Sequence, residues 1–162
     1  MQTRTTDVVV AGGGPTGLAL STALRKAGVD VLTFDREPRG GTESRAAALH
    51  ARTLEALNEL GVTEKLIAEG VVVPHFTFRE RDRLLADLLF SGLPTPYPFI
   101  LTLQQWRTEQ ILADALTSFG GQVLRPYEVS GVDIEAGGAT VSVQGPDGEQ
   151  RIRARFVVGA DG

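Results

Sequence analysis

The sequence contains no cysteine, and only two histidines, one tryptophan and one methionine among its 162 residues. A chain without cysteine forms no disulfide, offers no thiolate ligand to a metal and has no cysteine nucleophile. The two histidines, His50 and His75, are too few for a histidine-rich metal site. We therefore predict no metal centre.

Long apolar runs and an excess of positive charge are also missing. No run reaches the roughly 18 apolar residues that indicate a membrane-spanning helix, and the N-terminus lacks the pattern of a signal peptide. The net charge is −4, and the arginines are spread along the chain, which argues against a nucleic-acid surface. We expect a cytoplasmic globular chain with neither nucleic acid nor membrane as a partner.

The stretch from Asp7 to Glu37, DVVVAGGGPTGLALSTALRKAGVDVLTFDRE, carries the strongest local pattern. An apolar run predicts a strand buried on both faces. A G-x-G-x-x-G motif follows it, formed by Gly12, Gly14 and Gly17. The first glycine allows a tight turn, the second lets the backbone approach a pyrophosphate, and the third lets the helix pack on the strand. Pro15 suits the first helical turn.

A second predicted strand, over residues 29–34, ends at Asp35. A carboxylate at that position accepts hydrogen bonds from ribose hydroxyls, and it repels the 2′-phosphate of NADP. The N-terminus of the helix favours the pyrophosphate. The pattern therefore predicts an adenine-nucleotide site, but it does not choose between NAD and FAD.

The remainder of the chain predicts a mixed α/β protein. We expect helices over 49–60 and 105–119, and a pair of strands within 75–90 around a polar turn at Glu80 to Arg83. A short strand is expected over 99–103. Four further short strands are expected near 122–125, 128–135, 139–145 and 150–155, as an antiparallel meander, before a last strand in RFVVGADG.

Four segments in this order resemble the FAD-dependent aromatic hydroxylases, which are single-component flavoprotein monooxygenases typified by para-hydroxybenzoate hydroxylase. These segments are VVVAGGGPTGLALSTALRKAGVDVLTFDRE, ESRAAALHARTLEALNELGV, YPFILTLQQWRTEQIL and RFVVGADG. They are most similar to the phenol- and polyketide-hydroxylase branches. The resemblance favours FAD as the resident nucleotide.

The resemblance also implies roles for individual residues. Arg36 would lie beside the adenine, Arg45 would reach the pyrophosphate and the flavin side, and Gln105, with Glu109 four positions later, would contact the FAD chain. A backbone group of Val129 would meet the adenine, and Asp161 and Gly162 would lie near the pyrophosphate and the nicotinamide approach. The predicted cofactor-binding set is Gly12, Gly14, Pro15, Thr16, Gly17, Asp35, Arg36, Arg45, Gln105, Val129, Asp161 and Gly162. Asp35 stands where the family usually has glutamate. No catalytic residue is predicted.

The implied fold is a Rossmann-like FAD-binding domain with a βαβ start, a central parallel sheet and an antiparallel meander. Residues 1–73 and 102–162 would form two parts of this domain, and residues 74–101 would enter a substrate-binding sheet. The implied activity is hydroxylation of a phenolic or polyketide substrate with NAD(P)H, a transient cosubstrate, and O₂, through a flavin C4a-hydroperoxide. A homodimer would be compatible with this reading.

The sequence departs from the family in its length. Nothing in it matches the second, Gly-Asp-Ala-type FAD motif, so the chain is expected to be the N-terminal portion of such an enzyme, inactive without the C-terminal part. Two alternatives stay open at this point. The chain could be the nucleotide-binding domain of an NAD-dependent dehydrogenase or reductase, or a non-catalytic nucleotide-binding subunit.

Overall fold

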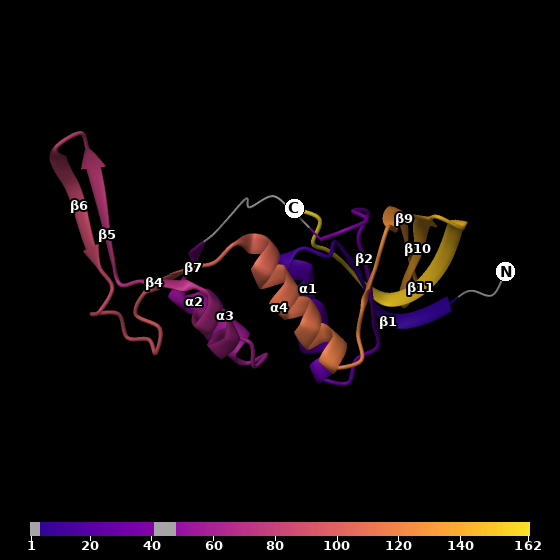
Figure 1. The fold of residues 1–162 in the computed structure, drawn as a ribbon. Helices are drawn as coiled ribbons and strands as arrows, with labels where there is room; N and C mark the ends of the chain where they lie inside the picture. Colours follow the sequence, from indigo (N-terminus) through magenta and orange to yellow (C-terminus); the bar gives the residue numbers. More distant parts are fainter. Residues whose placement is uncertain (1–3, 41–47) are drawn as a thin grey trace.

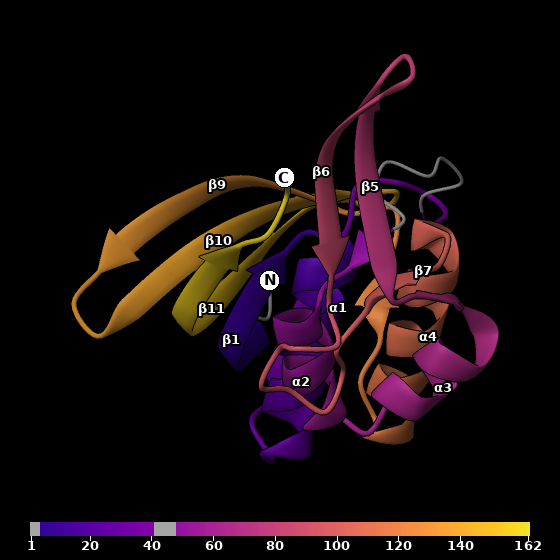
Figure 2. The ribbon, with the colours of Figure 1, turned by 90° about the vertical axis from the view of Figure 1, so that its left-hand side faces the viewer.

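A six-stranded mixed sheet forms one side of the structure, a computed structural model in which residues 4–40 and 48–162 are described (Figure 1). In spatial order its strands are β8 (Val123–Leu124), β2 (Val31–Phe34), β1 (Arg4–Ala11), β11 (Gly148–Gly159), β10 (Gly138–Gly145) and β9 (Glu128–Glu135). The first four run parallel, whereas β10 and β9 continue from β11 as an antiparallel meander (Figure 2). The predicted combination of a parallel sheet with a meander is confirmed.

Two helices lie side by side next to the parallel half of this sheet, and the first of them packs against β1 and β2 (Figure 1). They are α1 (Pro15–Lys26), which follows β1 directly, and α4 (Gln105–Ser118). Leu18 of α1 and Ile111, Leu112 and Leu116 of α4 are buried in the largest hydrophobic cluster. The adjacent Ile111 and Leu112 and the i, i+4 pair Leu112 and Leu116 lie on one face of the helix.

The region between β2 and α4 adds two short helices and a small sheet. The helices are α2 (Ala51–Asn58) and α3 (Thr63–Glu69), and the sheet has the order β3 (Ala48–Leu49), β7 (Ile100–Thr102) and β4 (Val71–Val73). Leu54 and Leu66 from the two helices are fully buried, together with Leu101 of β7. This region therefore shares the hydrophobic cluster of α1 and α4.

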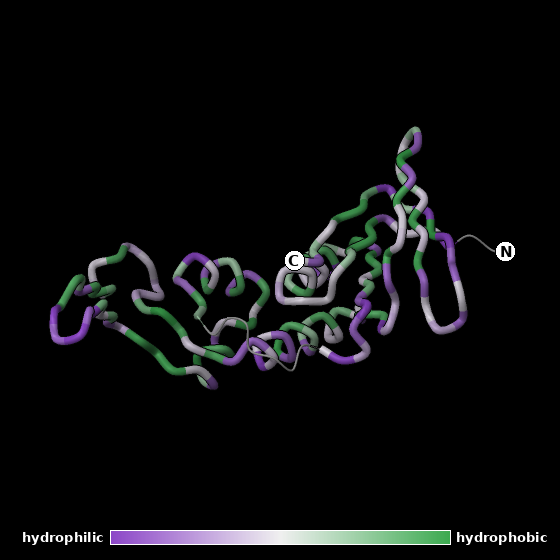
Figure 3. The backbone as a smooth tube through the Cα atoms, turned by 90° about the horizontal axis from the view of Figure 1, so that it is seen from above, coloured by the Kyte–Doolittle hydropathy of each residue, from purple (hydrophilic) through white to green (hydrophobic). Residues whose placement is uncertain are grey.

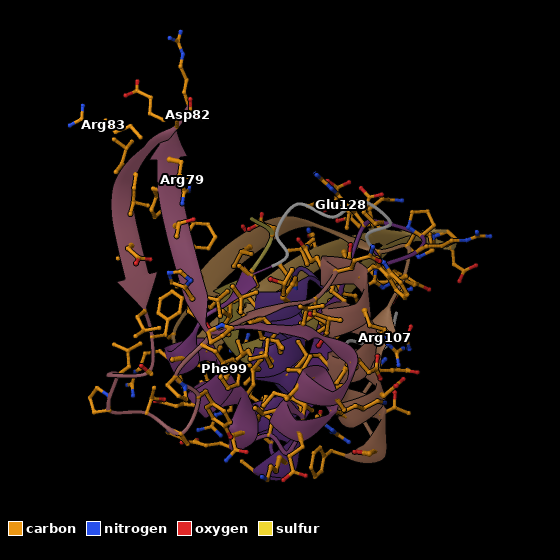
Figure 4. All side chains as sticks on the ribbon, turned by 60° about the vertical axis from the view of Figure 1, so that its left-hand side comes forward. Arg79, Asp82, Arg83, Phe99, Arg107 and Glu128 are labelled. Carbon is orange, nitrogen blue, oxygen red and sulfur yellow. The ribbon has the colours of Figure 1, made fainter. Side chains whose placement is uncertain are left out.

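A two-stranded hairpin projects away from the rest of the structure (Figures 1 and 2). Its strands are β5 (His75–Glu80) and β6 (Arg83–Leu89), and every residue in them except Ala86 is exposed. The far end is hydrophilic in Figure 3, and Figure 4 shows Arg79, Asp82 and Arg83 pointing outward there. The predicted strand pair around a polar turn is confirmed.

Four sequence expectations differ from the observed elements. The strand expected near 122–125 in the antiparallel meander is β8, which instead pairs in parallel with β2 at the other edge of the sheet. The helix expected over 49–60 is the shorter α2, since Gly61, with a φ of +77°, ends it, and α3 was not predicted. The two strands expected over 150–155 and RFVVGADG are the single strand β11. It pairs with β10 through its first half and with β1 from Ile152 to Gly159, so the chain changes partners without a turn.

In the described residues, no helix is both long and apolar enough to span a membrane.

Candidate nucleotide-binding site

The loop between β1 and α1 consists of three glycines, and two positions in this region leave no room for a side chain. Gly12 has a φ of +114°, and a Cβ added there would overlap the carbonyl of Ala160. A Cβ on Gly17 would overlap the carbonyl of Gly12. The first and third glycines of the motif therefore allow the tight turn and the close packing that the sequence predicted.

Gly14 differs because space is open around it. It is the residue before α1, its φ is −76°, and no atom lies within 4 Å of a Cβ built there. Pro15 is the first helical residue, and Thr16 after it is exposed. The first backbone N–H groups of a helix have no partner within the helix, and the helix dipole makes this end favourable for anions. This open backbone fits a pyrophosphate.

Asp35 follows β2 and is tied to the glycine loop. Its Oδ2 accepts a hydrogen bond from the Gly13 N–H at 3.1 Å, and its Oδ1 accepts one from the Glu37 N–H at 2.9 Å. The side chain is only 14% exposed and forms an ion pair with Arg125 at 3.2 Å. The Asp35 carboxylate is therefore held beside the glycine loop, where the parallel strands β1 and β2 both end.

The backbone of Asp35 also fixes the start of the meander. Its N–H donates to the Leu124 carbonyl at 3.0 Å, and its carbonyl accepts from the Tyr127 N–H at 2.8 Å. Two residues further, Val129 is half-buried and packs against the cluster that contains Phe34. Val129 therefore begins the meander close to the end of β2, although its predicted contact with adenine stays a prediction.

The C-terminal residues reach the same edge of the sheet. The N–H of Ala160 donates to the carbonyl of Ala11 at 2.7 Å, directly before the glycine loop. The backbone nitrogen of Asp161 lies 2.9 Å from a Cβ built on Gly12. Parallel strands β1 and β11 end together, so Asp161 and Gly162 follow β11 beside the turn at which β1 ends.

The remaining predicted residues are placed less closely. Gln105 begins α4, and its Nε2 donates to Oε1 of the buried Glu109 at 2.9 Å. Arg36 is exposed and lies 3.8 Å from the Glu37 carboxylate. Arg45 lies outside the described residues. The structure therefore gathers the glycines, Asp35 and the 161–162 end. Among the described residues, no hydrogen bond or ion pair joins the side chain of Gln105 or Arg36 to them.

Two residues of this edge were not predicted. Gly13 is buried, and a Cβ there would lie 2.6 Å from Asp35 Oδ2 and 2.8 Å from Arg125 Nη2. Arg125 follows β8, and its Nη2 donates to the carbonyl of Gly13 at 2.9 Å. The run of three glycines was a signal for Gly13. No local signal marked Arg125, because the strand before it was expected in the antiparallel meander. β8 is instead parallel to β2, and ligands bind at the carboxyl ends of such strands.

Comparison with known proteins decides between the two nucleotides that the motif left open. Residues 5–162 match the family described as FAD binding domain. The chain belongs to this family. Its resident cofactor is FAD, and the predicted Rossmann-like FAD-binding fold is confirmed.

Curated proteins that resemble this chain are named as monooxygenases. The chain is 37% identical over 156 residues to 12-dehydrotetracycline 5-monooxygenase/anhydrotetracycline 6-monooxygenase from Streptomyces rimosus, which covers 96% of this chain and 30% of the relative. It is 34% identical over 158 residues to pentachlorophenol 4-monooxygenase from Sphingobium chlorophenolicum, covering 96% of this chain and 29% of the relative. The chain thus spans less than a third of the length of these relatives.

A solved structure agrees with the sequence relatives. The crystal structure of p-nitrophenol 4-monooxygenase from Pseudomonas putida superposes with a TM-score of 0.93 at 30% identity. The match covers 98% of this chain and 42% of that chain. The fold described above is therefore also found within a longer monooxygenase.

Proposed function

We propose that the complete protein is an FAD-dependent monooxygenase that uses NAD(P)H and O₂ to hydroxylate a phenolic or polyketide substrate. The observation that supports this proposal best is the match of nearly the whole chain to the FAD-binding family, with relatives named for aromatic and tetracycline monooxygenation. FAD, when bound, supplies the redox chemistry. The described residues contribute the binding of its adenosine and pyrophosphate half.

In the proposed site, the glycine loop receives the pyrophosphate. The open backbone at Gly14 and the first turn of α1 at Pro15 and Thr16 supply N–H groups and the positive end of the helix dipole. Gly12 allows the loop to lie against Ala160, and Gly17 allows the first turn of α1 to lie against the Gly12 carbonyl. A side chain on either glycine would push the loop away from the pyrophosphate.

Further contacts are proposed for the remaining residues of the predicted set. Asp35 accepts hydrogen bonds from the adenosine ribose, Arg36 and the backbone at Val129 flank the adenine, and Arg45 and Gln105 contact the phosphates and the chain that leads to the flavin. Asp161 and Gly162 border the pyrophosphate and the nicotinamide approach. Their common position at the carboxyl ends of β1, β2 and β11 supports the roles of Asp35, Asp161 and Gly162.

The proposed domain organisation assigns residues 1–73 and 102–162 to FAD binding and residues 74–101 to a substrate-binding sheet. The separation of the β5–β6 hairpin from the six-stranded sheet supports this division. The rest of the enzyme would supply the remaining strands of the substrate sheet and the second FAD motif. A cytoplasmic location and a homodimer belong to the same proposal.

The first prediction tests the cofactor and the reaction. We expect the purified complete protein to release FAD on denaturation, and to oxidise NAD(P)H faster when a phenolic or polycyclic aromatic substrate is present. Released nucleotide is identified by chromatography, and hydroxylated product by mass spectrometry. Release of NAD without flavin would favour a dehydrogenase. Bound FAD without substrate-stimulated oxidation, over a broad panel of aromatics, would favour a non-catalytic subunit.

A further inference from the structure

Arg125 joins the glycine loop to Asp35 through one guanidinium nitrogen. Its Nη2 donates to the Gly13 carbonyl at 2.9 Å and lies 3.2 Å from Asp35 Oδ2. The same Oδ2 accepts from the Gly13 N–H at 3.1 Å. The side chains of Arg125 and Asp35 are 18% and 14% exposed, so this triangle of contacts is largely shielded from water. Charge-assisted hydrogen bonds in such surroundings are stronger than neutral ones.

These contacts leave the two oxygens of Asp35 in different states. A carboxylate has about two acceptor positions on each oxygen. Oδ2 already accepts from Gly13 and faces Arg125, whereas Oδ1 accepts, among the described residues, only from the Glu37 N–H. Oδ1 therefore keeps an acceptor position that a ribose hydroxyl can use. Arg125, by engaging Oδ2, determines which oxygen is left for the nucleotide.

The other terminal nitrogen of the Arg125 guanidinium lies outside this triangle of contacts. This nitrogen, Nη1, is buried and has no hydrogen-bond partner among the described residues. A buried donor without an acceptor costs free energy. Arg125 borders a cleft of about 600 Å³, which Gly40 and Glu109 also line. Nη1 thus lacks a partner among the described residues, while Nη2 contacts both Gly13 and Asp35. Such an unsatisfied group is expected where a residue serves a binding site.

We propose that Arg125 is a positioning residue for the adenosine half of FAD. It holds Asp35 so that Oδ1 faces the ribose hydroxyls, and it holds the Gly13 carbonyl so that the following backbone N–H groups face the pyrophosphate. A loop and carboxylate that are fixed before binding lose less conformational freedom when the nucleotide arrives. The inference rests on the FAD site of the proposed function and is independent of the hydroxylation step.

The test measures FAD affinity in the complete protein after removal of its flavin. We expect Arg125→Gln to raise the Kd for FAD about 10- to 100-fold, as a lost charge-assisted hydrogen bond predicts. Arg125→Lys, which keeps a cation, should recover part of the affinity. Arg153→Gln is the matched control, because Arg153 pairs with Glu135 in the meander, away from the loop. Unchanged affinity in Arg125→Gln would overturn the proposal.

Two further measurements separate positioning from a general loss of structure. In an Asp35→Asn background, Arg125→Gln should raise the Kd by a smaller factor than in the wild type, because the part of its effect that acts through Asp35 is already lost and only the Gly13 contact remains. The single variant Arg125→Gln should also lose more affinity for ADP than for 2′,3′-dideoxy-ADP, which lacks the ribose hydroxyls. Additive losses, or equal losses for both nucleotides, would show a merely structural role. A wild-type apoprotein that does not bind FAD would instead refute the proposed function.

Discussion

At the scale of single residues, Gly14 and Gly17 differ in the space that the fold leaves for a side chain. Gly17 is buried, and its Cβ position is filled by the carbonyl of Gly12. Gly14 has a φ of −76°, which any residue can adopt, and nothing within 4 Å of its Cβ position. The fold therefore requires glycine at position 17, whereas at position 14 only the proposed contact with the pyrophosphate would require it.

Alanine substitution should separate these two requirements. Gly17→Ala is expected to lower the stability of the apoprotein by about 1–3 kcal/mol, since it overpacks the β1–α1 turn, and to weaken FAD binding. Gly14→Ala should change the stability by less than about 0.5 kcal/mol, yet weaken FAD binding at least about tenfold. Thermal unfolding and FAD titration of both variants provide the check. A Gly14→Ala protein with normal FAD affinity would contradict the proposed pyrophosphate site.

Arg45 and Arg52 give a matched pair of arginines with different proposed roles. The Arg52 side chain is 93% exposed and pairs with Glu55 at 2.5 Å. Such exposed pairs contribute little to stability or binding. Arg45 lies outside the described residues, and its role at the FAD phosphates rests on the family resemblance.

Arg45→Ala is therefore expected to weaken FAD binding or slow flavin reduction more than Arg52→Ala does. A charge-assisted hydrogen bond to phosphate contributes about 1.5–3 kcal/mol, which corresponds to a Kd increase of roughly 10- to 150-fold. Titration of the apoprotein with FAD and stopped-flow reduction by NAD(P)H measure the two effects. Equal affinities and equal reduction rates in the two variants would refute the role of Arg45.

At the scale of elements, two ion pairs fasten α3 to α4. Arg107 donates to the Glu69 carboxylate through two nitrogens, one of them at 2.7 Å, and Lys65 lies 3.2 Å from Asp114. The hydrogen bond from Arg107 lowers the pKa of Glu69 below its usual 4.5, against the smaller opposing effect of desolvation. α3 is short, so contacts with its neighbours hold it in place more than its own backbone does.

The lowered pKa of Glu69 predicts an acid-dependent contribution to stability. A carboxyl whose folded-state pKa is depressed stabilises the fold above its unfolded pKa, and that contribution is lost as the pH falls through the folded pKa. Glu69→Gln should therefore lower the melting temperature at pH 6–7, and the difference from wild type should shrink below about pH 4.5. Glu149→Gln, at an exposed position of β11, serves as the control. A difference that does not vary with pH would contradict the ion-pair account.

At the scale of the whole molecule, the β5–β6 hairpin exposes an apolar face. Phe76 lies opposite Leu88 and Phe78 opposite Ala86. The ring centroids of the two phenylalanines are 5.0 Å apart, in an edge-to-face arrangement. Phe76, Phe78 and Leu88 are between 42% and 50% exposed. The opposite face carries His75 paired with Asp87. An exposed apolar face on an unpaired hairpin favours association with another surface.

The 162-residue chain by itself is therefore expected to self-associate and to catalyse no coupled hydroxylation. Because it spans only 28–40% of the length of curated relatives, most of a closed, dry flavin pocket would come from outside it. With added FAD and NAD(P)H we expect weak FAD binding and at most uncoupled oxidation. The checks are light scattering against concentration, oxygen uptake and product analysis. Hydroxylated product in proportion to NAD(P)H consumed would contradict this prediction.

A hairpin variant links the association to its cause. Phe76→Ser combined with Phe78→Ser removes the two large apolar side chains from one face while leaving the backbone pairing of the strands available. We expect this double variant to reduce self-association without changing FAD affinity. If self-association is unchanged, the surface responsible for it lies elsewhere, for example at the exposed Ile134 of β9.

The sequence by itself determined the local elements of the nucleotide site. The β1–α1 turn, Asp35 at the end of β2 and the meander were all predictable, because apolar periodicity and glycine positions act over neighbouring residues. The motif could not choose FAD, since NAD-binding and FAD-binding chains use the same glycine loop. That choice came from the order of four segments along the chain and was confirmed by the family match.

Only the tertiary structure decided which distant residues meet. Arg125 is 112 residues from Gly13, whose carbonyl accepts its hydrogen bond, and nothing in the local sequence specifies that contact. It exists because β8 pairs with β2 in parallel, which brings both carboxyl ends to one edge of the sheet. The single strand β11 has the same origin, since it pairs with β10 and then with β1. Strand order is set by burial of the whole core, so a pattern confined to neighbouring residues does not contain it.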